Sequence, residues 1–155
     1  MQPIPILMPL KDGHSIHSDS LAAISKQAVP TRLIIISRPA TEPESTARNI
    51  LLSLIPPAAD ICFFLDSDVM LTSPFDLPDL ACALRADNGT SLDILAINTK
   101  QNTSNLINIS CSVWLSSFAR SFTFLPDKHA TLESLNATAR IRLLDTRTRV
   151  ELPHS

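Results

Sequence analysis

The stretch Ile61-Cys62-Phe63-Phe64-Leu65-Asp66-Ser67-Asp68-Val69-Met70-Leu71 decides the fold of this chain. Five apolar residues are followed at once by two aspartates that flank one serine. The apolar run is short, contains two phenylalanines and follows a proline pair, so it predicts a strand that is buried on both faces. In open α/β sheets, ligands bind at the carboxyl ends of such strands. The stretch therefore predicts a ligand site at its two acids.

Asp66 and Asp68 are the first candidates for functional residues. Two carboxylates this close repel each other unless water or a cation offsets their charge. In an Asp-Ser-Asp step both can turn toward one hard cation, Mg²⁺ or Mn²⁺, which keeps open positions for water and phosphate oxygens. The same tripeptide also suits a strand that ends in a solvated Asx turn. The remainder of the chain has to decide between the metal site and the turn.

Composition narrows the class of protein. The 155 residues are 45% hydrophobic and 18% charged, which predicts one globular domain rather than a disordered chain. The net charge of -2 gives no broad attraction to nucleic acid, and no apolar run approaches the roughly 20 residues that span a bilayer. The first ten residues lack the layout of a secretory signal, so a cytoplasmic location is expected. Cys62, Cys82 and Cys111 are isolated and predict reduced core residues.

Hydrophobic patterning around the acid pair predicts alternating strands and helices. Three strands separated by two helices form βαβαβ, the half-unit of a doubly wound parallel sheet. The chain has two glycines and neither a Gly-x-Gly-x-x-Gly nor a Walker loop, which argues against dinucleotide-dependent dehydrogenases and P-loop ATPases. The expected elements are strand 4–10, a helix from 18 or 19 to 28, strand 32–37, a helix opened by a capping box at 41–44 with Ala47, Ile50, Leu51 and Leu54 on one stripe, strand 61–65, helix 74–86, strand 92–98, a half-exposed strand 106–115, a helical turn in 117–124, helix 131–139, and a closing hairpin or two short strands over 140–144 and 148–152.

Several stretches, taken in order, resemble the GT-A class of nucleotide-sugar glycosyltransferases, in particular its large inverting family 2-like group. None of them is specific alone, and their order and spacing carry the resemblance. They are Ile6-Leu7-Met8-Pro9-Leu10-Lys11-Asp12 (the opening strand and turn), Ser20-Leu21 through Ile24 and Gln27 (the first helix), Ala47-Arg48-Asn49 (the second helix), Phe64-Leu65-Asp66-Ser67-Asp68-Val69 (the DxD motif), and Ile141-Arg142-Leu143-Leu144-Asp145 through Val150 to His154 (the last strands).

The resemblance implies a Rossmann-like α/β GT-A fold with a mostly parallel central sheet flanked by helices. Residues 1–99 would form the nucleotide-sugar-binding half of a single domain, and 100–155 a shortened acceptor-side half. It implies a metal-dependent enzyme that transfers a sugar from a UDP- or GDP-linked donor to a hydroxyl of a glycan or another acceptor, with inversion. The implied metal ligands for Mn²⁺ or Mg²⁺ are Asp66, Asp68 and His154, and the implied donor-binding residues are Pro9, Lys11, Asp12, Ser37, Arg48, Asn49 and Asp66.

Inverting transfer also needs a base that takes the proton of the acceptor hydroxyl. The family draws it from an acid ahead of the C-terminal helix, where this chain has Asp127 and Glu133 but not the usual adjacent acidic pair. The second strand ends in Ser37-Arg38-Pro39, where the family often has an acidic residue that recognises the nucleobase. The identity of the nucleotide is therefore left undecided. Three alternatives stay open, of which the first two arise from the short acceptor side. These are an acceptor site completed by another copy in a homo-oligomer, a non-catalytic nucleotide-sugar-binding module, and a nucleotidyltransferase that uses the same cation.

Overall fold

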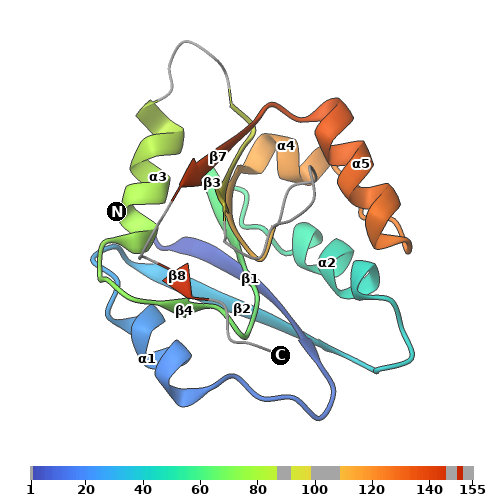
Figure 1. Cartoon of the computed structure of the whole chain (residues 1–155), viewed down its shortest axis with the longest axis horizontal. Coiled ribbons are helices and arrows are strands. Elements are labelled where there is room, and N and C mark those ends of the chain that lie inside the picture. The colour runs from blue at the N-terminus through green and yellow to red at the C-terminus, as the bar shows by residue number, and fades with distance from the viewer. Residues whose placement is uncertain (1, 87–91, 99–108, 146–149, 152–155) are drawn as a thin grey trace.

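The computed structural model describes residues 2–86, 92–98, 109–145 and 150–151, and shows a central sheet with helices on both faces (Figure 1). Among these residues, no helix has the length and apolar content that crossing a membrane requires. The elements are β1 Ile4–Lys11, α1 Ser18–Ser25, β2 Thr31–Arg38, α2 Glu44–Ser53, β3 Ile61–Leu65, β4 Met70–Leu71, α3 Asp76–Ala86, β5 Ile94–Asn98, β6 Cys111–Leu115, α4 Ser116–Ser121, α5 Lys128–Thr138, β7 Ile141–Asp145 and β8 Val150–Glu151.

The main sheet has the strand order β2-β1-β3-β6-β5-β7. β1 is parallel to both β2 and β3, and β5 is parallel to β7. β6 lies antiparallel between β3 and β5, while β4 and β8 form a separate antiparallel pair. The predicted βαβαβ half-unit is therefore confirmed, and the mostly parallel α/β Rossmann-like fold with it. Its carboxyl-end edge brings the ends of β1, β2 and β3 together.

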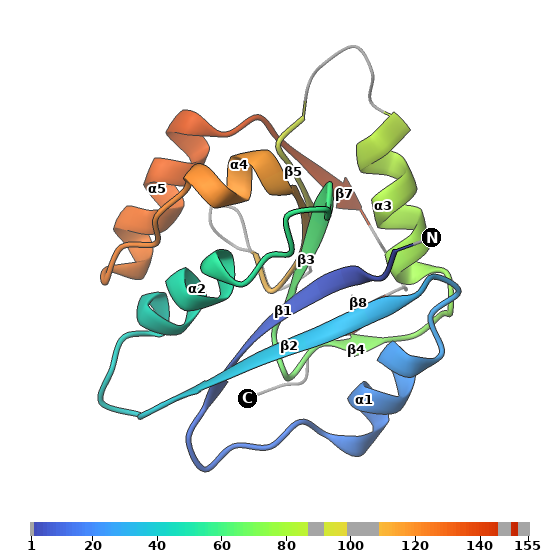
Figure 2. The same cartoon turned by 180° about the vertical axis from the view of Figure 1, so that it is seen from behind.

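Helices cover both faces of the sheet (Figure 2), and β1, β3, β5 and β6 contribute alternate side chains to a core on each face. β3 shows this most simply, because Phe63 packs on the face covered by α1 and α3, and Phe64 packs on the face covered by α2, α4 and α5. All five β3 residues are buried, as a strand in the middle of a two-faced sheet requires. The end of β3 is thus held from both sides, and the two acids after it leave the sheet at a fixed point.

Local sequence patterns misplace several side chains. β6 is buried through Trp114 and is not half-exposed, because it lies between β3 and β5 with helices on both faces. On α2, Ile50 and Leu54 are each 44% exposed, and the buried face instead holds Ser45, Ala47, Arg48, Leu51 and Leu52. The expected capping box is also absent, since Pro43 is the N-cap and has no side-chain hydrogen bond.

Two further expectations concern the last strands and the cysteines. β7 and β8 are two short strands in different sheets and not a hairpin, which was the other alternative. All three cysteines are free, and Cys62 and Cys111 are buried as predicted. Cys82 is exposed, so its assignment to the core was wrong: it follows the buried Leu80 and Ala81 on α3 and points away from them.

The cysteines give a simple check of this burial. Burial raises the pKa of the Cys62 thiol to about 12, and burial followed by the negative charges of Asp76 and Asp66 raises that of Cys111 further. Because the thiolate is the reactive form, we expect one fast-reacting thiol in the folded chain, with the buried pair at least about a hundredfold slower. Titration with Ellman's reagent before and after unfolding measures this. The fast phase should vanish in Cys82→Ser, and three equally fast thiols in the folded chain would contradict the described burial.

Candidate functional site

The two acids occupy the turn that follows β3. Asp66 is anchored by its backbone N–H, which donates to the carbonyl of Ser110 at 2.8 Å, and Val69 N–H closes the turn onto the Asp66 carbonyl at 3.1 Å. The Asp66 side chain is 25% exposed, and Asp68 is exposed. Partial desolvation, together with the charge of Asp66, raises the pKa of the Asp68 carboxyl above its ordinary value. The two carboxylates are therefore close enough to repel each other, as the sequence indicated.

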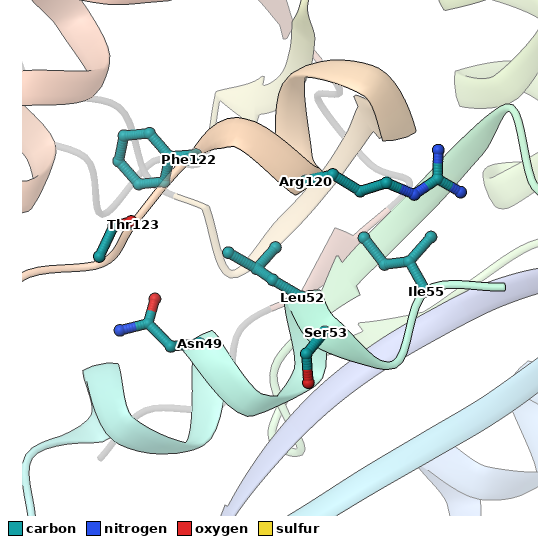
Figure 3. A pocket seen from close by; sticks show the side chains of 7 residues that line it. All are labelled: Asn49, Leu52, Ser53, Ile55, Arg120, Phe122 and Thr123. Carbon is teal, nitrogen blue, oxygen red and sulfur yellow. The ribbon is translucent and has the colours of Figure 1, made fainter. Parts of the chain in front are cut away.

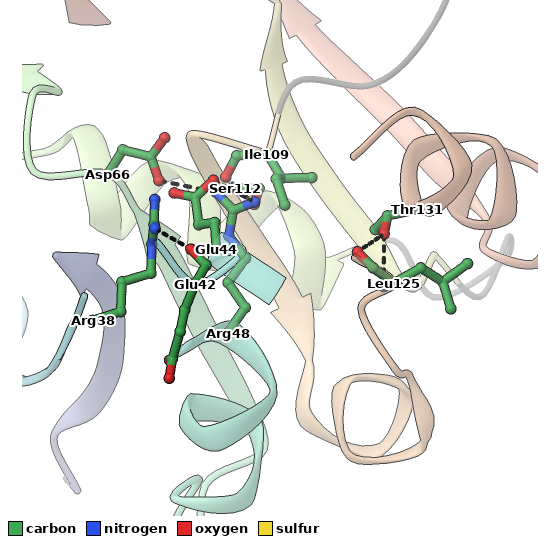
Figure 4. A network of polar contacts seen from close by, with 9 residues as sticks. All are labelled: Arg38, Glu42, Glu44, Arg48, Asp66, Ile109, Ser112, Leu125 and Thr131. Atoms are coloured by element: carbon green, nitrogen blue, oxygen red, sulfur yellow. Dashed lines mark hydrogen bonds and ion pairs between the residues drawn. The ribbon is translucent and has the colours of Figure 1, made fainter. Parts of the chain in front are cut away.

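Arg48 on α2 is the positive charge beside this pair (Figure 4). Its residue exposure is only 6%, and its Nη2 lies 3.3 Å from Asp66 Oδ1, while Nη1 lies 3.4 Å from Glu44 Oε2. Both distances exceed the 2.7–2.9 Å of well-formed charged hydrogen bonds, and Arg48 Nε has no acceptor among the described residues. The guanidinium carbon also stands 5.6 Å from the centre of the Phe124 ring. A buried guanidinium with donors to spare is suited to an anionic ligand.

The ends of β1 and β2 form the neighbouring wall of the site. Pro9 is buried and Lys11 is exposed at the end of β1. The Ser37 hydroxyl donates to Asp12 Oδ1 at 2.5 Å, and Asp12 N–H donates to the Arg38 carbonyl at 2.7 Å. These bonds tie the two strand ends together, and Gly13 then turns the chain with a φ of +83° that suits glycine. The predicted donor residues of β1 and β2 thus share one edge of the sheet.

Asn49 lies one residue beyond Arg48 and has a different partner. Its Nδ2 donates to the Phe124 carbonyl at 2.9 Å, and its Oδ1 accepts from Phe124 N–H at 2.7 Å. Both ends of the amide are thus engaged with the backbone of the segment between α4 and α5. The donor-binding role of Asn49 stays a prediction. The structure shows that its amide holds the backbone of Phe124.

The two candidate bases are Asp127, directly before α5, and Glu133, within it. Asp127 is its N-cap, and Oδ1 accepts from His129 N–H at 2.8 Å and from Ala130 N–H at 3.3 Å. Glu133 is exposed, and its Oε1 lies 3.0 Å from His129 Nε2. Asp127 therefore lies at the N-terminus of the helix, as a loop acid would, while Glu133 faces solvent nearly two turns further along α5.

The donor set at the acid pair fits a hard divalent cation. Apart from Asp66 Oδ1, the carboxylate oxygens of the pair receive no side-chain hydrogen bond from the described residues. Mg²⁺ and Mn²⁺ take oxygen ligands and complete their shells with water and phosphate oxygens, so two carboxylates are enough protein ligands. No group of three His, Cys, Asp or Glu side chains suited to a metal occurs within residues 2–86, 92–98, 109–145 and 150–151. His154, the predicted third ligand, lies outside the described residues.

A pocket of about 470 Å³ opens elsewhere, between α2 and the chain that follows α4 (Figure 3). Leu52, Ile55 and Phe122 form its apolar part. Arg120 stands at its rim, and its guanidinium donates to the Pro56 carbonyl at 2.7 Å and the Ala59 carbonyl at 3.3 Å. Asn49, Ser53 and Thr123 complete its lining, and neither Asp66 nor Asp68 belongs to it.

Sequence reasoning did not find the contacts around Phe124. The Ala-Arg-Asn stretch drew attention to Arg48 and Asn49, but their shared partner lies 75 residues away from Asn49. Thr131 was equally unmarked, although its hydroxyl accepts from Leu125 N–H at 2.8 Å and donates to the Leu125 carbonyl at 3.0 Å. The available signal was the run of phenylalanines 118, 122 and 124, which indicates an aromatic cluster but not its partners.

Solved structures of other proteins share the fold of this chain. No protein-family model matches the sequence, and no curated protein matches it. Among solved structures, TarS of S. aureus in complex with UDP-GlcNAc superposes with a TM-score of 0.68 at 13% identity, covering 99% of this chain and 60% of that one. The mannosyltransferase PcManGT of Pyrobaculum calidifontis, in complex with GDP-Man and Mn²⁺, gives a TM-score of 0.68 at 11% identity, covering 92% and 54%.

A third structure extends the comparison to another class of enzyme. The 4-diphosphocytidyl-2C-methyl-D-erythritol synthase of Anaerococcus prevotii gives a TM-score of 0.65 at 10% identity, covering 95% of this chain and 88% of that one. At such identities the likeness shows the fold alone, and that fold is the predicted GT-A type. The chain spans little more than half the length of the two glycosyltransferase chains named here.

Proposed function

We propose that this chain is a glycosyltransferase that moves a sugar from a nucleoside-diphosphate sugar to an acceptor hydroxyl, with inversion and with Mn²⁺ or Mg²⁺. The observation that carries the proposal is the pair Asp66 and Asp68 at the carboxyl end of β3, beside the buried Arg48. The shared fold of TarS, solved with UDP-GlcNAc, and of PcManGT, solved with GDP-Man and Mn²⁺, supports it. The UDP- or GDP-linked donor and the glycan or other hydroxyl acceptor are parts of the proposal.

Asp66 and Asp68 would hold the cation, with His154 as a third ligand. When bound, the cation would stabilise the negative charge that develops on the leaving nucleoside diphosphate. Arg48 would contribute a phosphate contact through its Nη atoms, because both of their ion pairs are long. The remaining proposed donor contacts are Pro9, Lys11, Asp12, Ser37 and Asn49, of which the first four lie at the ends of β1 and β2.

We assign the base to Asp127 in preference to Glu133. Asp127 ends the segment that Asn49 holds against α2, whereas the Glu133 carboxylate contacts His129 on its own helix. The cap of α5 uses Oδ1 of Asp127, which leaves Oδ2 to accept the proton of the acceptor hydroxyl.

Asp127→Asn separates the two functions of this side chain. Asparagine caps a helix about as well as aspartate, so the folded structure should be kept. We expect kcat of sugar transfer to fall about a hundredfold or more, because the amide cannot take a proton. Glu133→Gln, the matched control, should change kcat by less than about threefold. A large loss in Glu133→Gln alone would move the base to Glu133, and full activity in both would leave neither with the role.

The proposed activity can be tested directly. The chain is incubated with UDP- and GDP-linked sugars, with and without Mn²⁺, and release of the nucleoside diphosphate is followed. Calorimetry with the same nucleotides measures binding. Cation-dependent release supports the enzyme, whereas binding without release on any acceptor favours the non-catalytic module.

A nucleotidyltransferase is the second candidate, since the Anaerococcus prevotii synthase matches this chain over more of its own length than the glycosyltransferases do. Such an enzyme would release pyrophosphate from a nucleoside triphosphate and a sugar phosphate. The connection from β1 to α1 is Asp12-Gly13-His14-Ser15-Ile16-His17, which lacks the Gly- and Arg-rich phosphate loop expected there. Pyrophosphate release from CTP or UTP with a sugar phosphate distinguishes this reaction from release of a nucleoside diphosphate.

A further inference from the structure

The segment 122–127, between α4 and α5, is held from both sides by paired hydrogen bonds. On the α2 side, the Asn49 amide accepts from and donates to the backbone of Phe124. On the α5 side, the Thr131 hydroxyl does the same with the backbone of Leu125 (Figure 4). Two consecutive residues thus have both backbone groups fixed by a side chain from a neighbouring helix. This fixes the position of the segment that ends at Asp127.

Arg48 brings the acid pair into contact with the same segment. It is adjacent to Asn49 on α2, and it reaches Asp66 at 3.3 Å on one side and the Phe124 ring at 5.6 Å on the other. Phe124 is itself 3% exposed, so its ring cannot move without its neighbours. The backbone of Phe124 is therefore held by Asn49 and its ring by Arg48, whose other contact is the predicted metal ligand.

An ion bound at Asp66 would change the contacts that Arg48 makes with Asp66 and with the Phe124 ring. A cation competes with Arg48 for Asp66, and a diphosphate attracts the guanidinium. Either effect alters where Arg48 stands over Phe124, because the same guanidinium makes both contacts. Packed interiors respond to such shifts by moving between discrete arrangements.

We propose that α2 couples the acid-pair site to segment 122–127, with Asn49 as the positioning residue. Occupancy of the acid pair would shift Arg48 over Phe124, and Asn49 would carry the shift to the backbone that leads to Asp127. The inference rests on the proposed function for its ligand, a nucleoside diphosphate with a divalent cation. It adds a contact path within this chain, which runs from Asp66 through Arg48 and Asn49 to the backbone of Phe124.

The chain contains its own reporter for this coupling. Trp114 is the single tryptophan, tyrosine is absent, and Trp114 is fully buried. Its ring centre lies 5.9 Å from that of Phe124 and 5.8 Å from that of Phe122. Excitation at the red edge of tryptophan absorption therefore reports the packing around Phe124.

The test combines calorimetry with Trp114 emission during titration by UDP or GDP in the presence of Mg²⁺, which does not quench fluorescence as Mn²⁺ does. We expect the emission of the unaltered chain to change with the same midpoint as the heat of binding. In Asn49→Ala, compared with the unaltered chain at saturating nucleotide so that a change in affinity does not enter, the amplitude of the emission change should fall at least about twofold. Phe124→Leu, which removes the ring and keeps the backbone clamp, should also lose the response. It provides a second variant if Asn49→Ala fails to fold.

Ser53→Ala is the matched control, because its hydroxyl donates to the Ile50 carbonyl within α2 and not to the backbone of Phe124. It should keep both binding and emission change. Heat of binding without an emission change in the unaltered chain would overturn the coupling and leave the proposed function standing. An undiminished response in both Asn49→Ala and Phe124→Leu would do the same. No heat with either nucleotide would overturn the proposed function, and the coupling with it.

Discussion

Asp68→Asn is expected to lower cation-dependent sugar transfer about a thousandfold, equivalent to about 4 kcal/mol of transition-state stabilisation. The reason is the loss of one of the two proposed anionic ligands at the end of β3. The substitution is nearly isosteric and the side chain is exposed, so folding should not suffer. Replacement of Asp66 is less simple, because Asp66 is also the partner of the buried Arg48. We therefore expect Asp66→Asn to reduce both activity and stability.

Two measurements test the role of the acid pair. Calorimetry with Mn²⁺ should show an affinity loss of at least about tenfold in Asp68→Asn, and initial rates at saturating Mn²⁺ should show the loss of transfer. Asp19→Asn is the matched control, since Asp19 is an exposed acid on α1 whose side chain is 77% exposed. It should leave both quantities unchanged. Unaltered Mn²⁺ affinity and transfer in Asp68→Asn would leave the acid pair as a solvated turn.

The sequence predicts the sheet well because its strands are strongly patterned. The run 61–65 is apolar throughout, and a strand buried on both faces needs nothing else. The end of that strand locates Asp66 and Asp68, since parallel strands bring their carboxyl ends to one edge. The βαβαβ half of the sheet and the place of the candidate site therefore follow from local patterns and one topological rule, whereas the antiparallel β6 does not.

The buried faces of helices, and the contacts between residues far apart in the chain, are harder to predict from the sequence. Ile50 and Leu54 fit an apolar stripe but are exposed, because the buried face of α2 includes the polar Ser45 and the charged Arg48. Apolar patterning cannot identify a buried arginine, whose burial depends on partners elsewhere in the chain. For Arg48 these include Asp66 and Phe124, 18 and 76 positions away, and neither separation is marked in the sequence. The same holds for the clamp between Asn49 and Phe124.

Trp114→Ala is the substitution from which we expect the largest loss of stability. Trp114 is wholly buried on β6 and its ring packs against Phe64, Phe118, Phe122 and Phe124, with centres 4.9 to 5.9 Å apart. Its Nε1 also donates to the Ser112 hydroxyl at 2.8 Å. Truncation of a buried tryptophan leaves a large cavity, so the free energy of unfolding should fall by about 3–5 kcal/mol.

Trp114→Phe separates packing from hydrogen bonding in this loss. It keeps an aromatic ring among the phenylalanines and leaves the Ser112 hydroxyl donating to the Ile109 carbonyl at 3.1 Å. We expect it to lose about half as much stability as Trp114→Ala, because a smaller cavity remains and one hydrogen bond is gone. Urea unfolding followed by far-ultraviolet circular dichroism suits both variants, since neither retains tryptophan. Equal losses in the two would show that the hydrogen bond to Ser112, and not the aromatic packing, dominates. A loss below about 1 kcal/mol in Trp114→Ala would contradict the central place of this cluster in the fold.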